Sequence, residues 1–337
     1  MRAPLRDVWL PRLDSLCERI RDAARSSLAG SDPCQPMRAV RQGAGDVTYA
    51  LDDSTERAAL EWQLEIARTE PLSVLTEDSG WRHFGPARSG AKAVELAGFD
   101  HGGPRIALDP VDGTRNLMAD LRSAWTVVSF AGPGAGEPRL SEVELGVVAE
   151  IPDSRAARRR VLWAERGGPC HFELRGLDPH AAGEERVLAP NEDDRADHGY
   201  FPFFRYAPEE RPAIAALEAA FFERLERLEG AELRHCFDDQ YISNAGQLVL
   251  LALGTYRMIA DLRGLLARRR GRKTITSKPY DIAGAVVCAQ AAGCIVTAPD
   301  GGPLDFPLDC TTPVDFVGWT NAATARRLAP HLAAVLA

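Results

Sequence analysis

The chain has 337 residues, which is enough for one large domain or for two modest ones that share a core. Hydrophobic residues make up 45% and charged residues 26%, which is ordinary for a soluble globular protein. Acidic side chains number 48 against 40 of lysine and arginine, and the resulting formal charge of −8 argues against a general nucleic-acid binder.

The cysteines and the apolar segments predict a cytoplasmic protein that does not cross a membrane. The seven cysteines are odd in number and lack CxxC or zinc-site spacing, so reduced thiols are expected. Residues 1–20 carry charges throughout and lack the apolar centre of a signal peptide. The longest apolar run, residues 248–260, is too short to span a bilayer and contains Arg257.

The first hundred residues are predicted to contain two helices and two strands. Apolar residues recur at helical spacing over residues 1–28, which predicts one amphipathic helix. Residues 46–51 are a predicted strand, and a second helix, capped by Asp53 or Ser54, follows them. Residues 72–75 are the next predicted strand. The remaining segments, residues 31–45 and 81–102, are predicted to be a polar loop and a loop or short hairpin.

A run of eight residues then combines turn formers with oxygen ligands. After the apolar residues 105–108 comes Asp109-Pro110-Val111-Asp112-Gly113-Thr114-Arg115-Asn116. Asp-Pro and Asp-Gly are turn dipeptides, so the chain bends and sets two carboxylates around the Val111 carbonyl, as Mg²⁺ prefers. The amides of Gly113 and Thr114 would suit a phosphate, and Asn116 could cap a following helix. Taken alone, the run is also compatible with a plain tight turn.

Beyond this run, the pattern predicts more strands in the first half and a helix-rich second half. Residues 124–130, 145–151 and 160–164 suggest an antiparallel sheet. The polar segment 175–198 marks the predicted boundary between two halves, residues 1–185 and residues 186–337. The second half is predicted to contain a helix over 214–228 that ends at Gly230, a helix over 242–253, a helix from Asp281 to Gly293 and a last helix that Asn321 caps. Strands are predicted over 256–262 and 294–297. Periodicity alone indicates only an α/β protein.

Four segments of this chain occur in the order that is typical of the inositol monophosphatase family. They are residues 46–52, 75–80, 109–116 and 279–285. Over about residues 40–310 the chain resembles this family, which belongs to a wider group with fructose bisphosphatases and 3′-phosphonucleotide phosphatases. The resemblance implies a layered αβαβα sandwich, with an antiparallel sheet in the first half and a mixed sheet in the second. It also implies Mg²⁺-dependent hydrolysis of a small phosphorylated metabolite, such as an inositol, sugar or polyol phosphate, by a homodimer.

The resemblance further implies a set of metal ligands. Asp109 and Asp112 would be ligands, with Asp109 bridging two metal ions. Glu77 and the Val111 carbonyl would complete one site, and Asp281 would join the two aspartates at the other. Two or three Mg²⁺ ions are therefore expected in each active site.

The same resemblance assigns the residues that act on water and phosphate. Asp52 and Thr114 would form the pair that activates the attacking water, with the carboxylate acting as a base through the hydroxyl. The amides of Gly113 and Thr114 would hold the phosphate during an in-line attack. Out of context, Asp281 would be an ordinary helix cap and Asp52 a residue of a turn.

Several positions depart from the family pattern. Asp78 replaces the second of two usual glutamates, and Tyr280 replaces the usual tryptophan. Arg41 could stand in for a lysine that faces the metal site, or it could be a solvated side chain. The acidic residue that binds inositol hydroxyls, a few positions before the last aspartate, has no counterpart here, which puts inositol itself in doubt.

Residues 265–273, before Asp281, are basic and are predicted to form a loop that overhangs the pocket. Such a loop suggests a second anionic group on the substrate. Residues 261–264 resemble archaeal phosphatases that accept both inositol phosphate and fructose bisphosphate. Arg263, Arg268 and Arg269 are therefore candidate substrate-binding residues, although a charge run of this kind also suits a solvated loop. The alternatives to a monophosphatase are a bisphosphate-specific phosphatase and a catalytically weak sugar-phosphate-binding protein.

Overall fold

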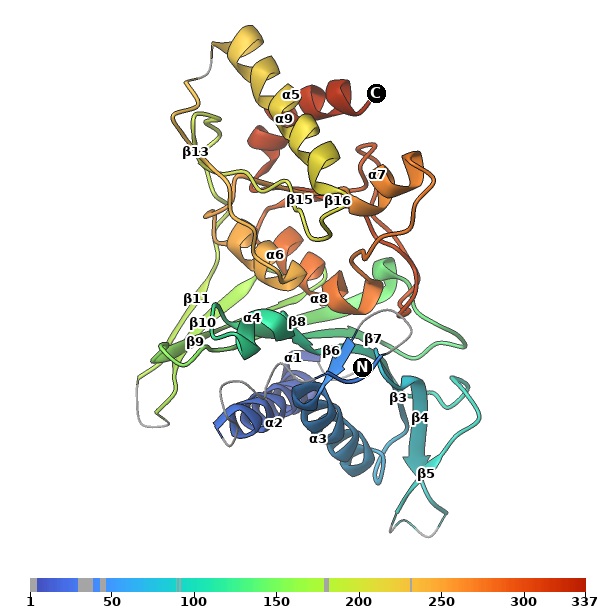
Figure 1. Ribbon diagram of the computed structural model, residues 1–337. Coiled ribbons are helices and arrows are strands. Elements are labelled where there is room, and N and C mark those ends of the chain that lie inside the picture. The colour runs from blue at the N-terminus through green and yellow to red at the C-terminus, as the bar shows by residue number, and fades with distance from the viewer. Residues whose placement is uncertain are drawn as a thin grey trace.

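A large sheet forms the centre of the molecule (Figure 1). The computed structural model describes residues 5–29, 39–42, 47–88, 90, 92–178, 182–230 and 232–337. Within that part of the chain, the strand order is β11 (Glu184–Val187), β10 (His171–Gly176), β9 (Arg158–Glu165), β8 (Val143–Ile151), β7 (Ala124–Ala131), β6 (Arg105–Asp112), β3 (Leu72–Thr76), β4 (Gly80–Pro86) and β5 (Ala93–Glu95). All neighbours are antiparallel except β3 and β6, which confirms the sheet predicted for the first half and adds one parallel pair.

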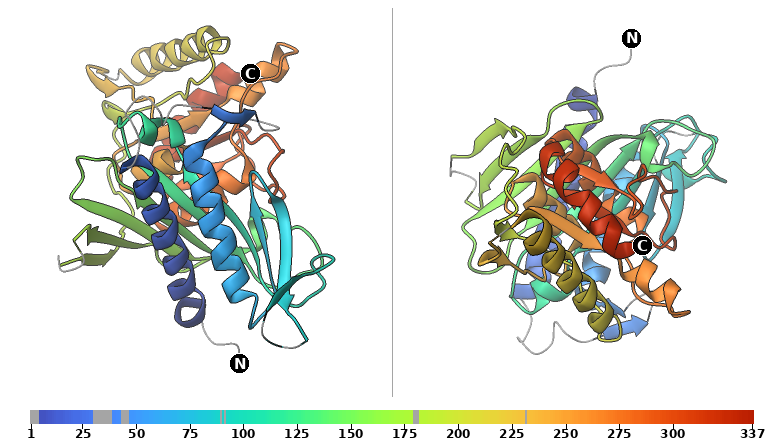
Figure 2. Two further views of the ribbon diagram at one scale, coloured as in Figure 1. Left: turned by 60° about the horizontal axis from the view of Figure 1, so that its bottom comes forward. Right: turned by 90° about the horizontal axis from the view of Figure 1, so that it is seen from above.

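Helices cover both faces of this sheet. α2 (Leu10–Ala29) and α3 (Ala50–Ile66) lie side by side on one face (Figure 2), and α6 (Asn244–Ala252) and α8 (Pro279–Ala291) cover the other. Because both faces are covered, the inner strands are apolar along their length, and every residue of β7 is buried.

A second sheet and an outer helical layer complete the sandwich. β14 (Met258–Asp261), β16 (Phe316–Trp319) and β15 (Ile295–Thr297) are antiparallel, and Phe203 adds a parallel bridge to Ala260. α5 (Arg211–Glu229) and α9 (Ala322–Leu336) pack on the outer face of this sheet (Figure 2). The layers are therefore helix, sheet, helix, sheet and helix, which confirms the αβαβα sandwich. The remaining elements are α1 (Leu5–Val8), β1 (Ala39–Gln42), β2 (Val47–Tyr49), α4 (Thr114–Met118), the 3-10 turn η1 (Leu140–Glu142), β12 (His198–Tyr200), β13 (His235–Phe237) and α7 (Arg263–Arg269).

Two glycines determine how closely α8 lies on the large sheet. A Cβ atom on Gly284 would lie 2.3 Å from the carbonyl oxygen of Val128 in β7. A Cβ atom on Gly146 of β8 would lie 2.3 Å from the carbonyl oxygen of Gly284. Only glycine permits such a close approach of helix and sheet backbones. This contact fixes the position of the first turn of α8, which carries Asp281.

Local chemistry explains where the observed elements differ from the predicted ones. The helix predicted over residues 1–28 is broken between α1 and α2, because Pro11 has no N–H to continue a helical ladder. Asp53 and Ser54 lie inside the first turns of α3, which begins at Ala50, so they are not its cap. Two predictions are confirmed: Asn321 caps α9 by accepting a 2.7 Å hydrogen bond from the Thr324 amide, and Gly230 ends α5.

Some predictions meet the limits of the described chain. Residues 30–38 and 43–46, which hold most of the predicted polar loop and the first residue of the predicted strand, lie outside the described residues, and only the backbone of Arg41 is described, in β1. The predicted division at residue 185 falls at β11. Every helix of the described residues is too short or too polar to cross a lipid bilayer.

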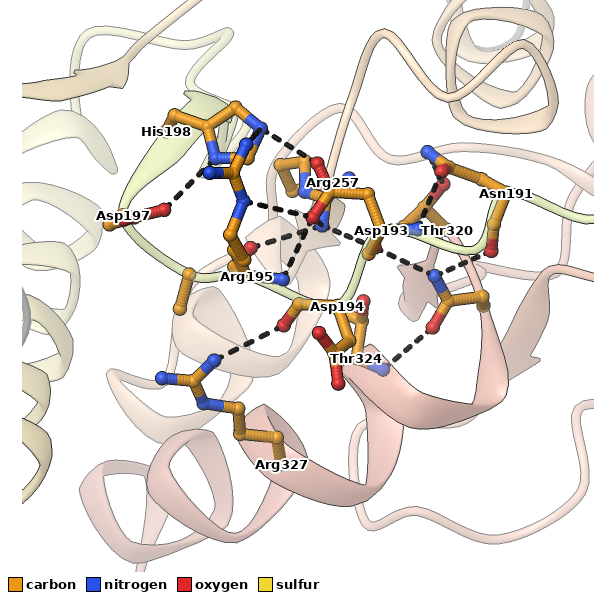
Figure 3. Close-up of polar contacts among 12 residues, drawn as sticks. Asn191, Asp193, Asp194, Arg195, Asp197, His198, Arg257, Thr320, Thr324 and Arg327 are labelled. Atoms are coloured by element: carbon orange, nitrogen blue, oxygen red, sulfur yellow. Dashed lines mark hydrogen bonds and ion pairs between the residues drawn. The ribbon is translucent and has the colours of Figure 1, made fainter.

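A buried arginine ties the segment between the two halves to the second sheet (Figure 3). Arg257 is 3% exposed, donates hydrogen bonds to the carbonyls of Asp193 and Arg195, and lies 3.3 Å from the Asp193 carboxylate. The same carboxylate lies 2.8 Å from His198 Nε2. Asn321 donates to the Asp193 carbonyl from the other side, at 2.9 Å. The segment between the two halves is therefore held by the residues directly before β14 and directly before α9.

We expect Arg257→Met to lower the free energy of unfolding by about 2–4 kcal/mol, because two carbonyls and a carboxylate lose their shared donor. Arg327, which is partly exposed and donates to the Asp194 carbonyl at 3.3 Å, is the matched control within the same cluster. Arg327→Met should cost less than about 1 kcal/mol. Urea unfolding of the two variants is the measurement, and equal losses would contradict the role given to Arg257.

Candidate active site

A cavity of about 550 Å³ collects residues from both halves of the chain. Its lining includes every residue proposed above as a metal ligand, as a catalytic residue or as a phosphate-binding residue: Asp52, Glu77, Asp109, Val111, Asp112, Gly113, Thr114 and Asp281. These residues come from α3, the turn after β3, the end of β6, the start of α4 and the start of α8. Segments more than 200 residues apart in sequence therefore meet at one place.

A β-bulge at the end of β6 brings two of the aspartates to the cavity. Asp109 pairs with Val127 and Asp112 with Trp125, so β6 has one residue more than β7 over this stretch. In a regular strand, residues three apart face opposite sides of the sheet, and the extra residue removes that alternation. Both carboxylates can then line the cavity. Thr126 donates a 2.9 Å hydrogen bond to the carbonyl of Pro110 in the bulge.

Gly113 follows the bulge, at a position where only a residue without a side chain fits. Its φ is +100°, in the left-handed region that favours glycine. A Cβ atom at this position would lie 3.1 Å from Cβ of Ser243 and 3.2 Å from the Ile242 carbonyl oxygen. Asn116 does not cap a following helix, which corrects the prediction; it lies within α4 and donates a 2.8 Å hydrogen bond to Ile242.

The start of α6 holds Asp112, a role that the sequence did not predict. Asp112 Oδ2 accepts hydrogen bonds of 2.7 Å from both the Ser243 hydroxyl and the Ala245 amide. Asn244 donates to Asp281 Oδ2 at 3.4 Å, and the Lys278 amide donates to Asp281 Oδ1 at 2.9 Å. A serine directly before an apolar helix is a capping signal, and Ser243 does cap α6, but nothing local to it points to Asp112.

The carboxylates of the cavity destabilise one another. Burial, and then the charges of Asp112, Asp281 and Glu77, raise the pKa of Asp109 well above its ordinary value. Burial raises the pKa of Asp112 to about 6, against the hydrogen bonds from Ser243 and Ala245. Burial and the charge of Asp112 raise the pKa of Asp281 in the same direction. A bound cation would relieve this repulsion, as expected of a metal site.

The chemistry of these donors fits a hard divalent cation, although their present spacing does not enclose one. No three His, Cys, Asp or Glu side chains among the described residues converge closely enough to hold an ion as they stand. Oxygen donors, buried carboxylates and raised pKa values are nevertheless what Mg²⁺ or a similar ion would need.

The Asp52 and Thr114 side chains are in direct contact. The Thr114 hydroxyl lies 3.1 Å from Asp52 Oδ1 and 2.9 Å from the carbonyl oxygen of Val111. A hydroxyl has one proton, so it can donate fully to only one of these acceptors at a time. A cation on the Val111 carbonyl would leave Asp52 as the better acceptor.

The predicted substrate-binding arginines divide into two groups. Arg263 lines the cavity, but its guanidinium makes two hydrogen bonds to Asp261, at 2.8 and 2.7 Å, and one of 3.1 Å to Ser277. Arg268 instead donates to Asp315 at 2.8 Å, and neither it nor Arg269 lines the cavity. Their segment continues as the helix α7 to Arg269, so the predicted loop over the pocket is corrected.

Arg115, Glu56 and Tyr206 are among the further residues that line the cavity and that the sequence did not predict. The guanidinium of Arg115 lies 5.6 Å from the centroid of the Tyr206 ring. Glu56 lies one helical turn after Asp52 on α3. The (i, i+4) spacing of Asp52 and Glu56 was a usable signal, because such residues share one face of a helix. No pattern in the neighbouring sequence indicates that Tyr206 lines the cavity.

The metal-free protein should show a specific dependence of stability on pH. A carboxyl with a raised pKa in the folded state stabilises the fold at low pH and loses that contribution as pH rises through the folded value. For Asp112 this window runs from its ordinary 3.8 to about 6. Asp112→Asn should therefore melt at a higher temperature than wild type in EDTA at pH 7, and the difference should disappear near pH 4. A difference that is constant with pH would contradict the buried, repelled carboxylate.

No protein-family model and no curated protein sequence matches this chain. Solved structures match along nearly the whole chain. A hypothetical protein from Pyrococcus horikoshii, described as having similarities to inositol-1 monophosphatase, has 14% identity and a TM-score of 0.62, with 98% of each chain covered. The extragenic suppressor protein suhB from Bartonella henselae has 15% identity and a TM-score of 0.62, with 96% of this chain and 97% of that chain covered.

A third solved structure carries two activities in its description. The MJ0109 gene product, described as inositol monophosphatase–fructose 1,6-bisphosphatase, has 12% identity and a TM-score of 0.62, with 96% of this chain and 98% of that chain covered. At these identities the likeness shows a shared fold. The fold implied by the four sequence segments is therefore confirmed by an independent comparison.

Proposed function

We propose that this chain, which has the fold of the inositol monophosphatase structures, is a Mg²⁺-dependent phosphatase of a small phosphomonoester. The observation that carries the proposal is the content of one cavity: four carboxylates suited to a cation beside a hydrogen-bonded Asp52–Thr114 pair. A fold alone does not define an activity, so the proposal rests on this site.

The chain's own residues would divide the work as follows. Glu77, Asp109, Asp112, Asp281 and the Val111 carbonyl would hold two or three Mg²⁺ ions. Bound Mg²⁺ supplies charge neutralisation and acidifies a water. Asp52 would take the proton of that water through the Thr114 hydroxyl, which donates to Asp52 as it accepts from the water. The amides of Gly113 and Thr114 would orient the phosphate for in-line attack.

The test is release of inorganic phosphate from a panel of phosphorylated metabolites with Mg²⁺ and with EDTA. We expect turnover with Mg²⁺ and none with EDTA. A protein that binds sugar phosphates tightly but releases no phosphate with any metal would instead be a sugar-phosphate-binding protein. The Asp52–Thr114 contact favours the enzyme, because a binding protein has no need of it.

A bisphosphate-specific phosphatase remains the second candidate. Arg268 of α7 donates to Asp315, and neither Arg268 nor Arg269 lines the cavity. Arg115 and Lys278 do line the cavity and could bind a second anionic group. A second anionic group on the substrate would attract these positive side chains, whereas the uncharged hydroxyls of a polyol would not.

Arg115→Ala should lower kcat/KM for a bisphosphate substrate by about 10–100-fold, the value of one charge-assisted hydrogen bond, and less for a monophosphate. Arg268→Ala is the matched control and should change neither value. Steady-state kinetics with both substrates decides the matter. An equal loss of kcat/KM for the two substrates would show that Arg115 does not bind a second anionic group.

We also propose, from the resemblance, a cytoplasmic homodimer that binds neither nucleic acid nor membrane. Light scattering coupled to size-exclusion chromatography would measure the oligomeric state directly.

A further inference from the structure

Glu56 connects the helix that carries Asp52 to the turn that carries Glu77. Its Oε2 atom accepts a 2.8 Å hydrogen bond from the hydroxyl of Thr76. Thr76 directly precedes Glu77, and the charge of Asp78, on the other side of Glu77, also acts on Glu56. One side chain of α3 therefore holds the residue directly before a proposed metal ligand.

Glu77 needs such support because of where it lies. Residues 77–79 form the exposed turn between β3 and β4. Exposed turns are the more mobile parts of a fold, whereas a metal ligand must be held within about 0.5 Å of its working position. Glu56 lies on α3, which is packed against the large sheet over most of its length. The hydrogen bond from Thr76 thus attaches the residue before this exposed turn to a helix that is packed on the sheet.

The place that Glu56 occupies is electrostatically unfavourable. Burial, and then the charges of Asp78 and Glu77, raise its pKa to about 7, against the hydrogen bond from Thr76. A carboxyl group at this position therefore carries an electrostatic cost, and the hydrogen bond from Thr76 is the contact that it makes there.

We propose that Glu56 is a positioning residue that holds Glu77 at the metal site by accepting a hydrogen bond from Thr76, the residue directly before it. The inference rests on the proposed Mg²⁺ function but goes beyond it, because Glu56 itself is not placed among the ligands. It acts through this hydrogen bond.

The experiment is Mg²⁺ titration by isothermal calorimetry, with melting temperatures in EDTA as a second readout. Glu56→Ala removes the hydrogen bond and should weaken Mg²⁺ binding by about 10–100-fold, the usual effect of losing a partner that orients a ligand. Glu56→Gln keeps an acceptor of the same shape without the charge and should stay within about threefold of wild type, since it retains a hydrogen bond of this kind. Glu61→Ala, at an exposed site on the same helix, is the matched control and should bind as wild type does.

A third variant tests the same contact from its other side. Thr76→Val removes the donor and should weaken Mg²⁺ binding about as much as Glu56→Ala does, and the double variant should be no worse than Glu56→Ala alone, because both changes break the same contact.

Three results would overturn the inference. Unchanged Mg²⁺ affinity in Glu56→Ala, with a lowered melting temperature in EDTA, would make Glu56 purely structural. Equal losses in Glu56→Gln and Glu56→Ala would show that the charge itself matters, as in a direct ligand. A wild-type protein that binds no Mg²⁺ would overturn the proposed function and this inference together, whereas the first two results leave the proposed function intact.

Discussion

Replacing Asp112 by asparagine should reduce phosphate release at saturating Mg²⁺ by more than about 100-fold, beyond the usual loss for a residue that only supports a ligand. Asp112 is 8% exposed and accepts hydrogen bonds from Ser243 and Ala245 through Oδ2, which leaves its other oxygen for a cation. An asparagine can accept the same two hydrogen bonds through its carbonyl, so the local structure should survive. What it lacks is the negative charge.

The measurement separates loss of function from loss of fold. Phosphate release and the melting temperature in EDTA are determined for Asp112→Asn and for the control Asp300→Asn, whose carboxylate lies in an exposed turn. We expect the first variant to be inactive yet at least as stable as wild type at pH 7, because a repelled carboxylate has been removed. Near wild-type turnover at saturating Mg²⁺ would show that Asp112 is not a ligand.

Asp52→Asn and Thr114→Ala should each lower kcat by about 100-fold or more, the range of general-base catalysis, with little change in stability. The two side chains are 3.1 Å apart, and the proposed proton path runs through both of them. Removing either one breaks the whole path. The double variant should therefore be little worse than the poorer single variant, because residues that act as one unit are not additive.

A double-mutant cycle on kcat is the decisive measurement for this pair. Losses that multiply fully would show that Asp52 and Thr114 act independently.

Much of the fold and of the cavity was predictable from local sequence signals. The Asp-Pro and Asp-Gly dipeptides predicted the bend after β6, and Asn321 and Gly230 predicted the limits of α9 and α5. These signals are reliable because capping and left-handed glycine geometry depend on a few neighbouring residues. The resemblance of four segments then predicted which carboxylates share one cavity, and all of them line it.

The residues that the sequence did not predict depend on contacts between distant segments. The charge of Arg268 suggested a phosphate partner, but its side chain donates to Asp315, 47 residues further along the chain. Ser243 was a visible cap, but its partner Asp112 lies 131 residues earlier. Glu56 carried only a weak helical spacing signal, and its donor Thr76 lies across the α3–β3 contact.

The sequence by itself therefore determined the turns, the caps and the identity of the carboxylates. Only the tertiary structure decided which side chains orient those carboxylates and which arginines reach the cavity. The physical reason is one of range: backbone geometry is set by neighbours within about one helical turn, whereas a hydrogen-bond partner is set by how helices and sheets pack. In this protein that packing depends on contacts such as Gly284 on Val128, which place α8 and Asp281 over the large sheet.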